Sequence, residues 1–384
     1  MTQSITHACG TLRPILRVGL IGCGEIAQVA HIPNLNHMSD KFVTTYLCDV
    51  SQQALLHCAA KVSQGPPKTT RDAEVLCSSD EVDVVVIASA DAFHVPHAIL
   101  ALKYDKYCLL EKPAALNYRD IDALIKAESS SKGKVFVGYM RRYSLAFLEA
   151  VKEVKEMQDI RYARVRDIIG PNSDFVDQSG TFPRRFDDIS MEDINDLNER
   201  KEDIIDQALT KEFGVDATPF SKLILILLGG LGSHDLSAMR ELLGMPKSCL
   251  AASFAPPGIW TALFQYDGFP VIYESGFNSI PTFDCCIEVL SDDKTVRINY
   301  ETPYIKGLPI TLTIRERVEG SFGSSGFQER VIRPTYEDAY NLEFDAFYEC
   351  VLSREIPKTT VADARSDIDL YAMIFKASHA KATC

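Results

Sequence analysis

The spacing of small residues near the start of the chain is typical of a phosphate-binding turn. Gly22-Cys-Gly24-Glu-Ile-Ala27 follows an apolar run and precedes a helical pattern, which is the GxGxxA form of the dinucleotide fingerprint. The glycines allow a tight turn and a close approach to a pyrophosphate, and the helix N-terminus adds free N–H groups. We expect a dinucleotide to contact Gly22, Gly24, Glu25, Ile26 and Ala27; the alternative is a glycine turn without a ligand.

An acidic residue, Asp49, ends the next apolar run, residues 42–48. In this position a carboxylate accepts hydrogen bonds from the adenosine ribose hydroxyls and repels a 2′-phosphate. The next residues are Val50 and Ser51, so no Arg or Lys follows directly. The pattern favours NAD over NADP as cofactor. The alternative role of Asp49 is to cap the helix that follows.

Lys112 and His234 have the side-chain types that hydride transfer at a secondary alcohol needs. Such a reaction requires a base for the hydroxyl proton and a donor or cation that stabilises the developing alkoxide. Lys112 follows an apolar run at the end where parallel sheets bind ligands, and His234 stands where a helix is expected to begin, with Ser233 as N-cap and Gly244 as the C-terminal stop. Both are candidate catalytic residues, although a surface lysine and a structural histidine are the alternatives.

Short apolar runs alternate with helical patterns over the first third of the chain. The runs are mostly continuous, as expected for strands covered on both faces. The expected strands are residues 17–22, 42–48, 82–88, 106–110 and 134–138. The expected helices are residues 51–62, 92–103 and 118–129, the last with Asn117 as N-cap. This order predicts a Rossmann-type, doubly wound parallel sheet in a dinucleotide-binding domain, residues 1–140.

The pattern changes after about residue 141, where an α/β domain with a large, mostly antiparallel open sheet is expected, residues 141–384. Its strands are expected at residues 161–169, 249–254, 261–266, 271–276, 284–290, 295–300 and 308–315. Its helices are expected at residues 145–157, 341–353 and 361–380. The acidic insertion at about 171–219 is either a solvated surface excursion or a lid over a substrate.

Composition excludes several classes of function. The net charge of -13 and the pI of about 5.2 argue against nucleic acid as a general partner. The chain contains no run of about 18 apolar residues, so no membrane span is expected. Neither end resembles a targeting signal. The 11 cysteines have irregular spacing, which indicates free thiols in a cytoplasmic protein and no metal site.

Four further motifs, in order along the chain, resemble one enzyme family. They are Ala88-Ser-Ala-Asp-Ala-Phe-His94, Glu111-Lys112-Pro113, Gly138-Tyr-Met-Arg-Arg-Tyr143 and Gly232-Ser-His-Asp235. Together with the glycine turn they resemble the glucose–fructose oxidoreductase, inositol dehydrogenase and rhizopine-catabolism (Gfo/Idh/MocA) family. The resemblance implies that Ser89, Ala90, His94, Glu111 and Lys112 lie near the cofactor. It also implies homodimers or homotetramers that pair through the open sheet.

The same resemblance implies an NAD(P)-dependent oxidoreductase that transfers hydride to or from a sugar, polyol or related cyclic alcohol or ketone. One departure stands out, because Gly230 replaces the family's acid four residues before His234. Either the Lys–His pair suffices, or another acid such as Asp235 substitutes, or the substrate is unusual. Two other functions stay open: a redox-neutral enzyme that holds NAD tightly, and a non-catalytic dinucleotide sensor.

Overall fold

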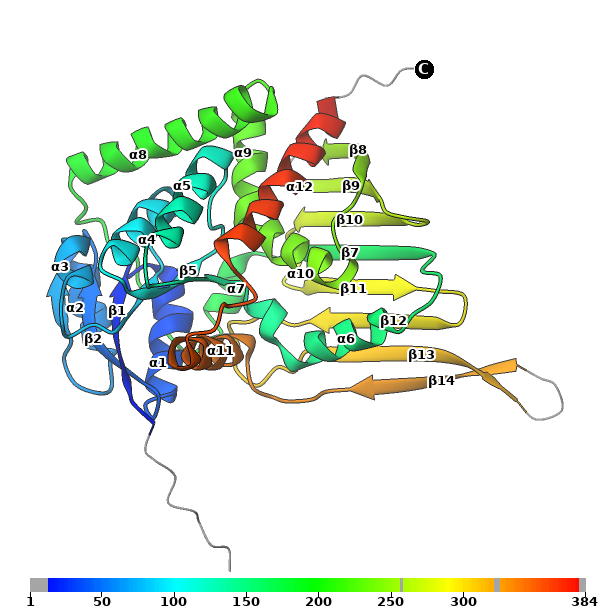
Figure 1. Ribbon diagram of the computed structural model, residues 1–384, viewed down its shortest axis with the longest axis horizontal. Helices are drawn as coiled ribbons and strands as arrows, with labels where there is room; N and C mark the ends of the chain where they lie inside the picture. The colour runs from blue at the N-terminus through cyan, green and yellow to red at the C-terminus, as the bar shows by residue number, and fades with distance from the viewer. Residues whose placement is uncertain (1–12, 256–257, 321–324, 380–384) are drawn as a thin grey trace, which may run out of the picture.

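The computed structural model describes residues 13–255, 258–320 and 325–379, which form two sheets side by side (Figure 1). Cys9, Cys384 and the predicted helix end at residue 380 lie outside this part of the chain. The first sheet is entirely parallel, in the order β3-β2-β1-β4-β5-β6. Its strands are β1 (Leu16–Ile21), β2 (Phe42–Cys48), β3 (Lys68–Thr70), β4 (Val84–Ile87), β5 (Tyr107–Glu111) and β6 (Val135–Gly138). This order confirms the predicted doubly wound sheet.

Helices cover both faces of the first sheet. They are η1 (Ala27–His31), α1 (Ile32–His37), α2 (Gln52–Ala59), α3 (Ala73–Cys77), η2 (Asp91–Phe93), α4 (His94–Lys103) and α5 (Tyr118–Ser129). Because successive strand residues point to opposite faces, Val84 and Val86 pack in the core formed with α1, α2 and the late helix α11 (Ala339–Ser353). Val85 and Ile87 pack in the core formed with α3, α4 and α5. Asn117 caps α5 as predicted, since its side chain accepts a bond from the Asp120 amide.

The second sheet has eight strands in the order β14-β13-β12-β11-β7-β10-β9-β8. Its strands are β7 (Tyr162–Ile169), β8 (Ser248–Ala255), β9 (Ile259–Gln265), β10 (Pro270–Phe277), β11 (Phe283–Leu290), β12 (Lys294–Tyr300), β13 (Thr311–Glu319) and β14 (Ser325–Ile332). Only β7 and β10 pair in parallel within the described sheet. The mostly antiparallel character was predicted, whereas β3 and β14 were not.

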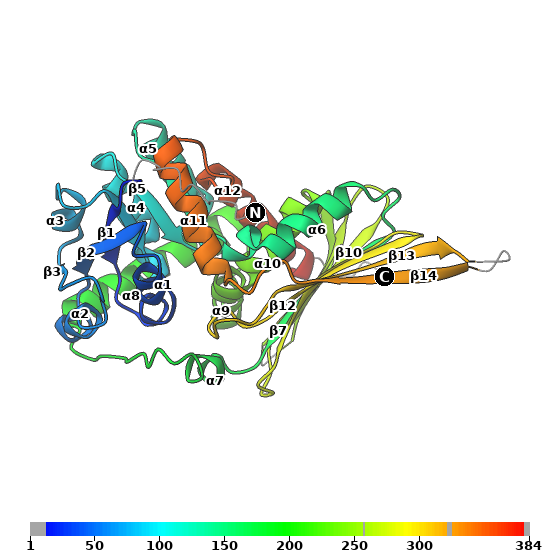
Figure 2. The same cartoon turned by 90° about the horizontal axis from the view of Figure 1, so that it is seen from below.

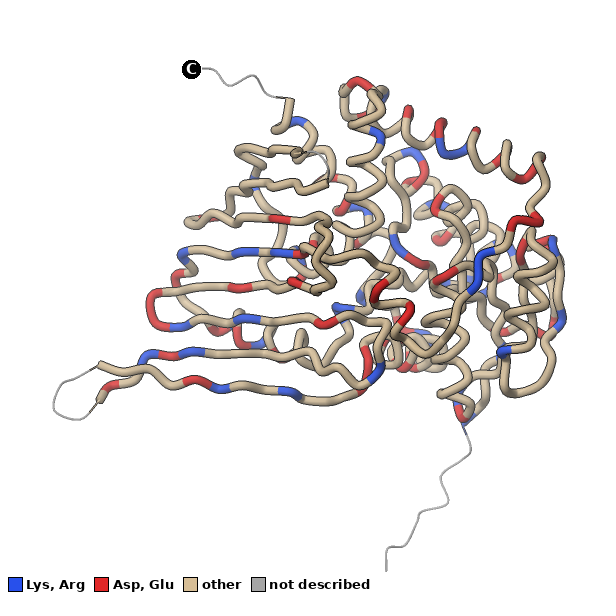
Figure 3. Tube along the Cα trace, turned by 180° about the vertical axis from the view of Figure 1, so that it is seen from behind, with Lys and Arg blue, Asp and Glu red and all other residues tan. Residues whose placement is uncertain are grey.

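One face of the second sheet is covered and the other is open. The helices α6 (Leu145–Lys155), α10 (Ser233–Leu243) and α12 (Val361–His379) lie on one side, and the described residues place no helix on the opposite face (Figure 2). The open face carries ion pairs between neighbouring strands, with Arg164 and Arg166 both bound to Glu274. Figure 3 shows these charges along the strands. An open face of this size needs a partner or solvent-compatible side chains, and the ion pairs supply the latter.

The acidic insertion follows β7 and consists mainly of helices. They are α7 (Asn172–Val176), α8 (Met191–Asp206) and η4 (Gln207–Phe213). The insertion is followed by α9 (Pro219–Leu227) and η5 (Leu228–Gly232), which continue into α10. The run Pro219–Leu243 is long and apolar enough to cross a membrane, which differs from our expectation of no such segment. However, 61% of its most apolar window is buried inside the protein, as in a core helix.

Candidate active site

The glycine turn joins β1 to η1 and leaves open space where a ligand would lie. Gly22 has φ +98°, and a Cβ at this position would lie 2.3 Å from the Ala88 carbonyl oxygen, so only glycine fits. At Gly24, by contrast, a Cβ would meet no atom within 4 Å. The first helical bond runs from the Gln28 amide to the Gly24 carbonyl (3.1 Å), and the amides of a first helical turn have no partner within the helix. This turn therefore fits a pyrophosphate.

Asp49 lies beside the glycine turn, as expected. Its carboxylate accepts hydrogen bonds from the Cys23 amide (2.7 Å) and the Ser51 amide (2.8 Å). Burial raises the pKa of the Asp49 carboxyl, while these two amide bonds act in the opposite direction. The cap of α2 is Ser51, whose Oγ accepts from the Ala54 amide (2.9 Å). Asp49 thus stabilises the glycine turn, and Ser51 is the residue that caps α2.

His94 joins the ends of the two strands that carry the next motifs. Its Nδ1 lies 2.8 Å from the Pro113 carbonyl oxygen, and its Nε2 lies 3.0 Å from the Ser89 carbonyl oxygen. The side chain is 1% exposed. Its visible role is to hold the segment after β4, with Ser89 and Ala90, against the turn after β5. Contact of these three residues with a cofactor remains a prediction.

Glu111 faces the protein interior, where His31 is its partner. The ion pair joins His31 Nε2 to Glu111 Oε1 at 3.0 Å, and the Lys112 amide donates to Glu111 Oε2 (3.2 Å). Burial acts to raise the pKa of Glu111, but the bond and charge of His31 and the charge of Lys112 bring this pKa below its usual value. Glu111 therefore positions the backbone of Lys112. Sequence reasoning missed this pairing, because residue 31 stands alone in a helical pattern.

Lys112 and His234 are brought to the same place. Lys112 Nζ donates to the Gly230 carbonyl oxygen (2.6 Å), one helical turn before His234. The His234 side chain is buried, and burial together with the charges of Lys112 and Arg141 places its pKa well below the usual value. His234 is accordingly neutral at pH 7, and its Nδ1 has no hydrogen-bond partner among the described residues. A neutral imidazole beside an ammonium group forms a proton acceptor next to a donor.

The helix that carries His234 does not begin at residue 233, so the predicted N-cap is wrong. Thr218 caps the run through the Ser221 amide (3.1 Å), and α9, η5 and α10 are continuous. Ser233 has helical backbone angles, and its Oγ donates to the Gly229 carbonyl (2.7 Å). The π-helical turn η5 carries the glycines, and such turns are frequent at functional sites. Gly244, with φ +82°, ends α10 as predicted.

Asp235, one candidate substitute for the lost acid, has a different partner. Arg141 Nη1 donates to Asp235 Oδ1 (2.5 Å) and to Asp167 Oδ2 (3.0 Å). Burial and the neighbouring Asp167 raise the pKa of Asp235 well above its usual value. With Cys285 these two carboxylates are close enough to hold a metal ion, but the guanidinium already supplies the positive charge there. Among the described side chains, no acid therefore pairs with Lys112 Nζ in place of the one lost at Gly230.

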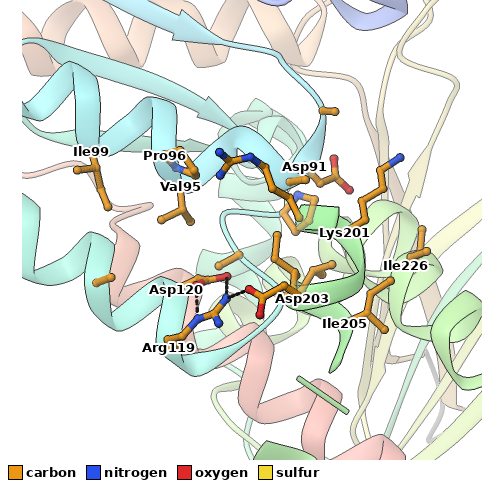
Figure 4. A pocket seen from close by; sticks show the side chains of 18 residues that line it. Asp91, Val95, Pro96, Ile99, Arg119, Asp120, Lys201, Asp203, Ile205 and Ile226 are labelled. Carbon is orange, nitrogen blue, oxygen red and sulfur yellow. Dashed lines mark hydrogen bonds and ion pairs between the residues drawn. The ribbon is translucent and has the colours of Figure 1, made fainter. Parts of the chain in front are cut away.

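A cavity of about 410 Å³ lies next to this site, between α4, α5 and α8 (Figure 4). Its walls include Val95, Ile99 and Ile205, and its rim carries the ion pairs of Arg119 with Asp120 and Asp203. Pro113 and Ala90 border the cavity, whereas Lys112 and His234 do not line it. It is therefore a neighbour of the candidate site and not its centre.

Comparison with known proteins shows what the first third of the chain is similar to. Residues 16–139 match a model described as an oxidoreductase family with an NAD-binding Rossmann fold. This part of the chain is similar to the Gfo/Idh/MocA oxidoreductase family. A myo-inositol 2-dehydrogenase of Thermotoga maritima is 30% identical over 170 residues, covering 43% of this chain and 49% of the relative. The aligned part therefore spans about half of that relative's length.

Other proteins are similar along nearly the whole chain at lower identity. Inositol 2-dehydrogenase 2 of Saccharopolyspora erythraea is 24% identical over 360 residues, covering 91% of this chain and 88% of the relative. A myo-inositol 2-dehydrogenase structure from Lactobacillus plantarum aligns with a TM-score of 0.68 at 16% identity, covering 95% and 97% of the two chains. A 3-ketoreductase from Actinomadura kijaniata, solved with NADP, aligns with a TM-score of 0.69 at 15% identity, covering 95% and 98%. These similarities show that the chain shares the fold of both structures along nearly its whole length.

Proposed function

We propose that this oxidoreductase uses NAD to move hydride to or from a secondary alcohol or ketone of a sugar, polyol or related cyclic compound. The observation that carries the proposal is the convergence of Lys112 and His234 beside the ends of β4 and β5. The substrate class rests on the inositol dehydrogenases and the ketoreductase named among the relatives and similar structures. Because one fold supports many chemistries, the site residues carry more weight than the fold.

The residues present fit a nicotinamide dinucleotide. The open space at Gly24 accepts a pyrophosphate, and Asp49 beside it suits a ribose diol. Glu25 and Ile26 begin the helix that follows the turn, and Ala27 opens η1. The bound group supplies the carbon that gains or loses hydride. Because Asp49 disfavours a 2′-phosphate, we assign NAD in preference to NADP.

The chain's own residues handle the proton and the substrate oxygen. Lys112 Nζ, now bound to a backbone carbonyl, would donate to the substrate oxygen and stabilise its negative charge. His234, neutral because of burial, would accept the hydroxyl proton in oxidation and return it in reduction. Glu111, paired with His31, positions the backbone of Lys112. This division assigns Lys112 and His234 as the catalytic pair.

The partners and place of this oxidoreductase follow from its charge and its open sheet. We propose a small-molecule substrate, a cytoplasmic location, and a homodimer or homotetramer through the open face. The net charge of -13 disfavours nucleic acid, and the burial of the apolar helical run disfavours a membrane. The two domains, residues 1–140 and 141–384, are proposed as cofactor-binding and substrate-binding units.

A redox-neutral enzyme with tightly held NAD is the second candidate. Two hydrogen bonds favour this candidate. They join the side chain of Gln28, which follows the glycine turn, to the Arg184 backbone of the insertion. The non-catalytic sensor is disfavoured, because Lys112 and His234 are both retained and adjacent. Gly230 in place of an acid is compatible with either alternative.

Turnover measurements separate these functions. Purified protein is incubated with NAD⁺ and inositols, sugars or uronates, or with NADH and their keto forms, and absorbance at 340 nm is followed. Steady NADH formation or consumption with one compound is the expected result. Dinucleotide that copurifies and never exchanges would favour the redox-neutral enzyme. Exchangeable binding with no reaction throughout the panel would contradict the proposed dehydrogenase.

A further inference from the structure

The segment between α7 and α8 crosses the edge of the first sheet at which the dinucleotide is proposed to bind. We define residues 181–190 as the strap; Figure 2 shows its path from α7 past α2. Gln28 binds it through two bonds, from its Nε2 to the Arg184 carbonyl (2.9 Å) and from the Arg184 amide to its Oε1 (2.8 Å). Lys61 Nζ donates to the Thr181 carbonyl (2.5 Å), and the ring of Phe186 lies 5.5 Å from that of His57. The strap is thus anchored on η1 and on the region of α2.

These anchors place a second carboxylate beside Asp49. Asp188 accepts a hydrogen bond from Ser51 Oγ and another from the Gln53 amide (2.9 Å). Ser51 and Gln53 form the first turn of α2, and Asp49 binds the Ser51 amide. The charge of Asp188 reaches Asp49, since it acts to raise the pKa of that carboxyl. The donors at this helix end are therefore taken by acidic side chains of two separate segments.

A basic side chain whose charge acts on Asp49 also has an acidic partner already. Arg71 follows β3, and its charge acts on Asp49. It is paired with Asp193 of α8, the helix that begins directly after the strap (2.9 Å). A 2′-phosphate on the adenosine ribose needs helix-end amides or an arginine close to the acid of the second strand. Asp188 accepts from the helix-end amide, and Asp193 pairs with the arginine. Both kinds of group therefore already have an acidic partner.

We infer that Asp188 is a specificity-determining residue that, together with Asp49, makes the site reject NADP and accept NAD. This inference rests on the proposed function, because it assumes that the adenosine ribose lies at Asp49. Two carboxylates and a 2′-phosphate at one helix end repel each other, whereas a ribose diol brings no charge. The insertion thereby carries a recognition element for the cofactor, contributed from the second half of the chain.

The test is a titration of the full chain with NADH and with NADPH, followed by nucleotide fluorescence. Asp188→Asn keeps the size of the side chain and removes its charge, and the preference for NADH over NADPH should fall by about tenfold. Asp193→Asn, which frees Arg71, should lower the preference in the same direction. Asp187→Asn is the matched control, because Asp187 is exposed and adjacent; its preference should equal that of the wild type. Circular dichroism melts verify that each variant is folded.

The possible outcomes separate this inference from the proposed function. NADH binding with an unchanged preference in both the Asp188 and Asp193 variants would overturn the inference and leave the proposed function intact. Equal affinity of the wild type for NADH and NADPH would also overturn it. Absence of binding of either dinucleotide to the wild type would overturn the proposed function and this inference together.

Discussion

Lys112 and His234 differ in burial and in charge, and the roles proposed for them follow from that difference. His234 is kept neutral by burial and by the charges of Lys112 and Arg141. Lys112 keeps one strong hydrogen bond, to a carbonyl oxygen that a substrate hydroxyl could replace. A donor and an acceptor of protons in one place are the minimum for reversible hydride transfer at an alcohol.

Lys112→Ala should reduce kcat by about 10²- to 10⁴-fold, the usual contribution of a positioned proton-transfer group. Dinucleotide affinity should stay within about threefold, because the glycine turn and Asp49 are untouched. Lys106→Ala is the control: Lys106 precedes the same strand at its other end and donates to the Val82 carbonyl (2.6 Å). The measurement is steady-state kinetics on a substrate found in the panel. Normal turnover of Lys112→Ala would refute the assignment.

His97 supplies a pH-dependent term in stability. Burial lowers its pKa to about 4, whereas an unfolded histidine titrates near 6.5. As the pH falls, the unfolded chain therefore binds a proton at His97 before the folded chain does. The contribution of His97 to the free energy of unfolding is fully present above pH 6.5 and is lost as the pH falls toward 4. The loss at pH 4 is about 3 kcal/mol.

His97→Gln should abolish this part of the acid sensitivity while keeping a polar partner for Ser89, which lies 3.0 Å from His97 Nδ1. Urea unfolding of both proteins at pH 7 and pH 4 measures the effect. Equal losses of unfolding free energy in the two proteins would show that His97 does not bear the proton.

The glycine turn, Asp49, Lys112 and His234 could be predicted because each belongs to a local motif with a mechanical reason. The partners of these residues could not be predicted. The pairing of His31 with Glu111, and of Asp235 with Arg141, depends on elements far apart in the chain. The bond of Lys112 to Gly230 likewise requires the course of η5, which no local pattern encodes.

At the scale of elements, apolar patterns located the buried strands and missed two exposed ones, β3 and β14. β3 is Lys-Thr-Thr, and β14 is exposed along nearly its whole length, so neither has a buried face to create a pattern. The insertion was read as a surface excursion or a lid, and α8 is indeed highly acidic (Figure 3). Its course along the first sheet comes from hydrogen bonds such as that of Gln28 with the Arg184 backbone.

Gln28→Ala should release the strap, because both bonds to Arg184 come from this one side chain. Hydrogen–deuterium exchange should then rise in residues 181–190, with little change in the strands of the first sheet. Gln53→Ala, on the exposed side of α2, is the control. Unchanged exchange in the strap of the Gln28 variant would mean that other contacts hold it.

At the scale of the whole molecule, the two halves are tied by a helix from the end of the chain. α11 packs Phe344 and Tyr348 against Phe42 of the first sheet, with ring centroids 5.6 and 5.5 Å apart. A boundary at residue 140 therefore separates the two sheets but not every element of the two cores. The open face of the second sheet is the remaining large surface without a covering layer among the described residues.

Ile272→Arg should shift the protein toward monomers if copies pair through that face. Ile272 is opposite Leu263 and Arg164 in the sheet, so a third cation near Arg164 and Arg166 would oppose association. Sedimentation velocity of the wild type and the variant measures the effect, with Leu56→Arg on an exposed helix surface as control. A wild type that is already monomeric would contradict the proposed assembly.

The most direct test of dinucleotide binding is an NADH titration of the Gly24→Asp variant beside the wild type. A side chain at residue 24 meets no protein atom within 4 Å, so the variant should fold and melt like the wild type. It would nevertheless place a negative charge where the pyrophosphate is proposed to lie, and affinity should fall by roughly 100-fold. Gly326→Asp, at an exposed strand position, should bind NADH normally. Equal NADH affinity of Gly24→Asp and the wild type, or no binding to the wild type, would contradict the account.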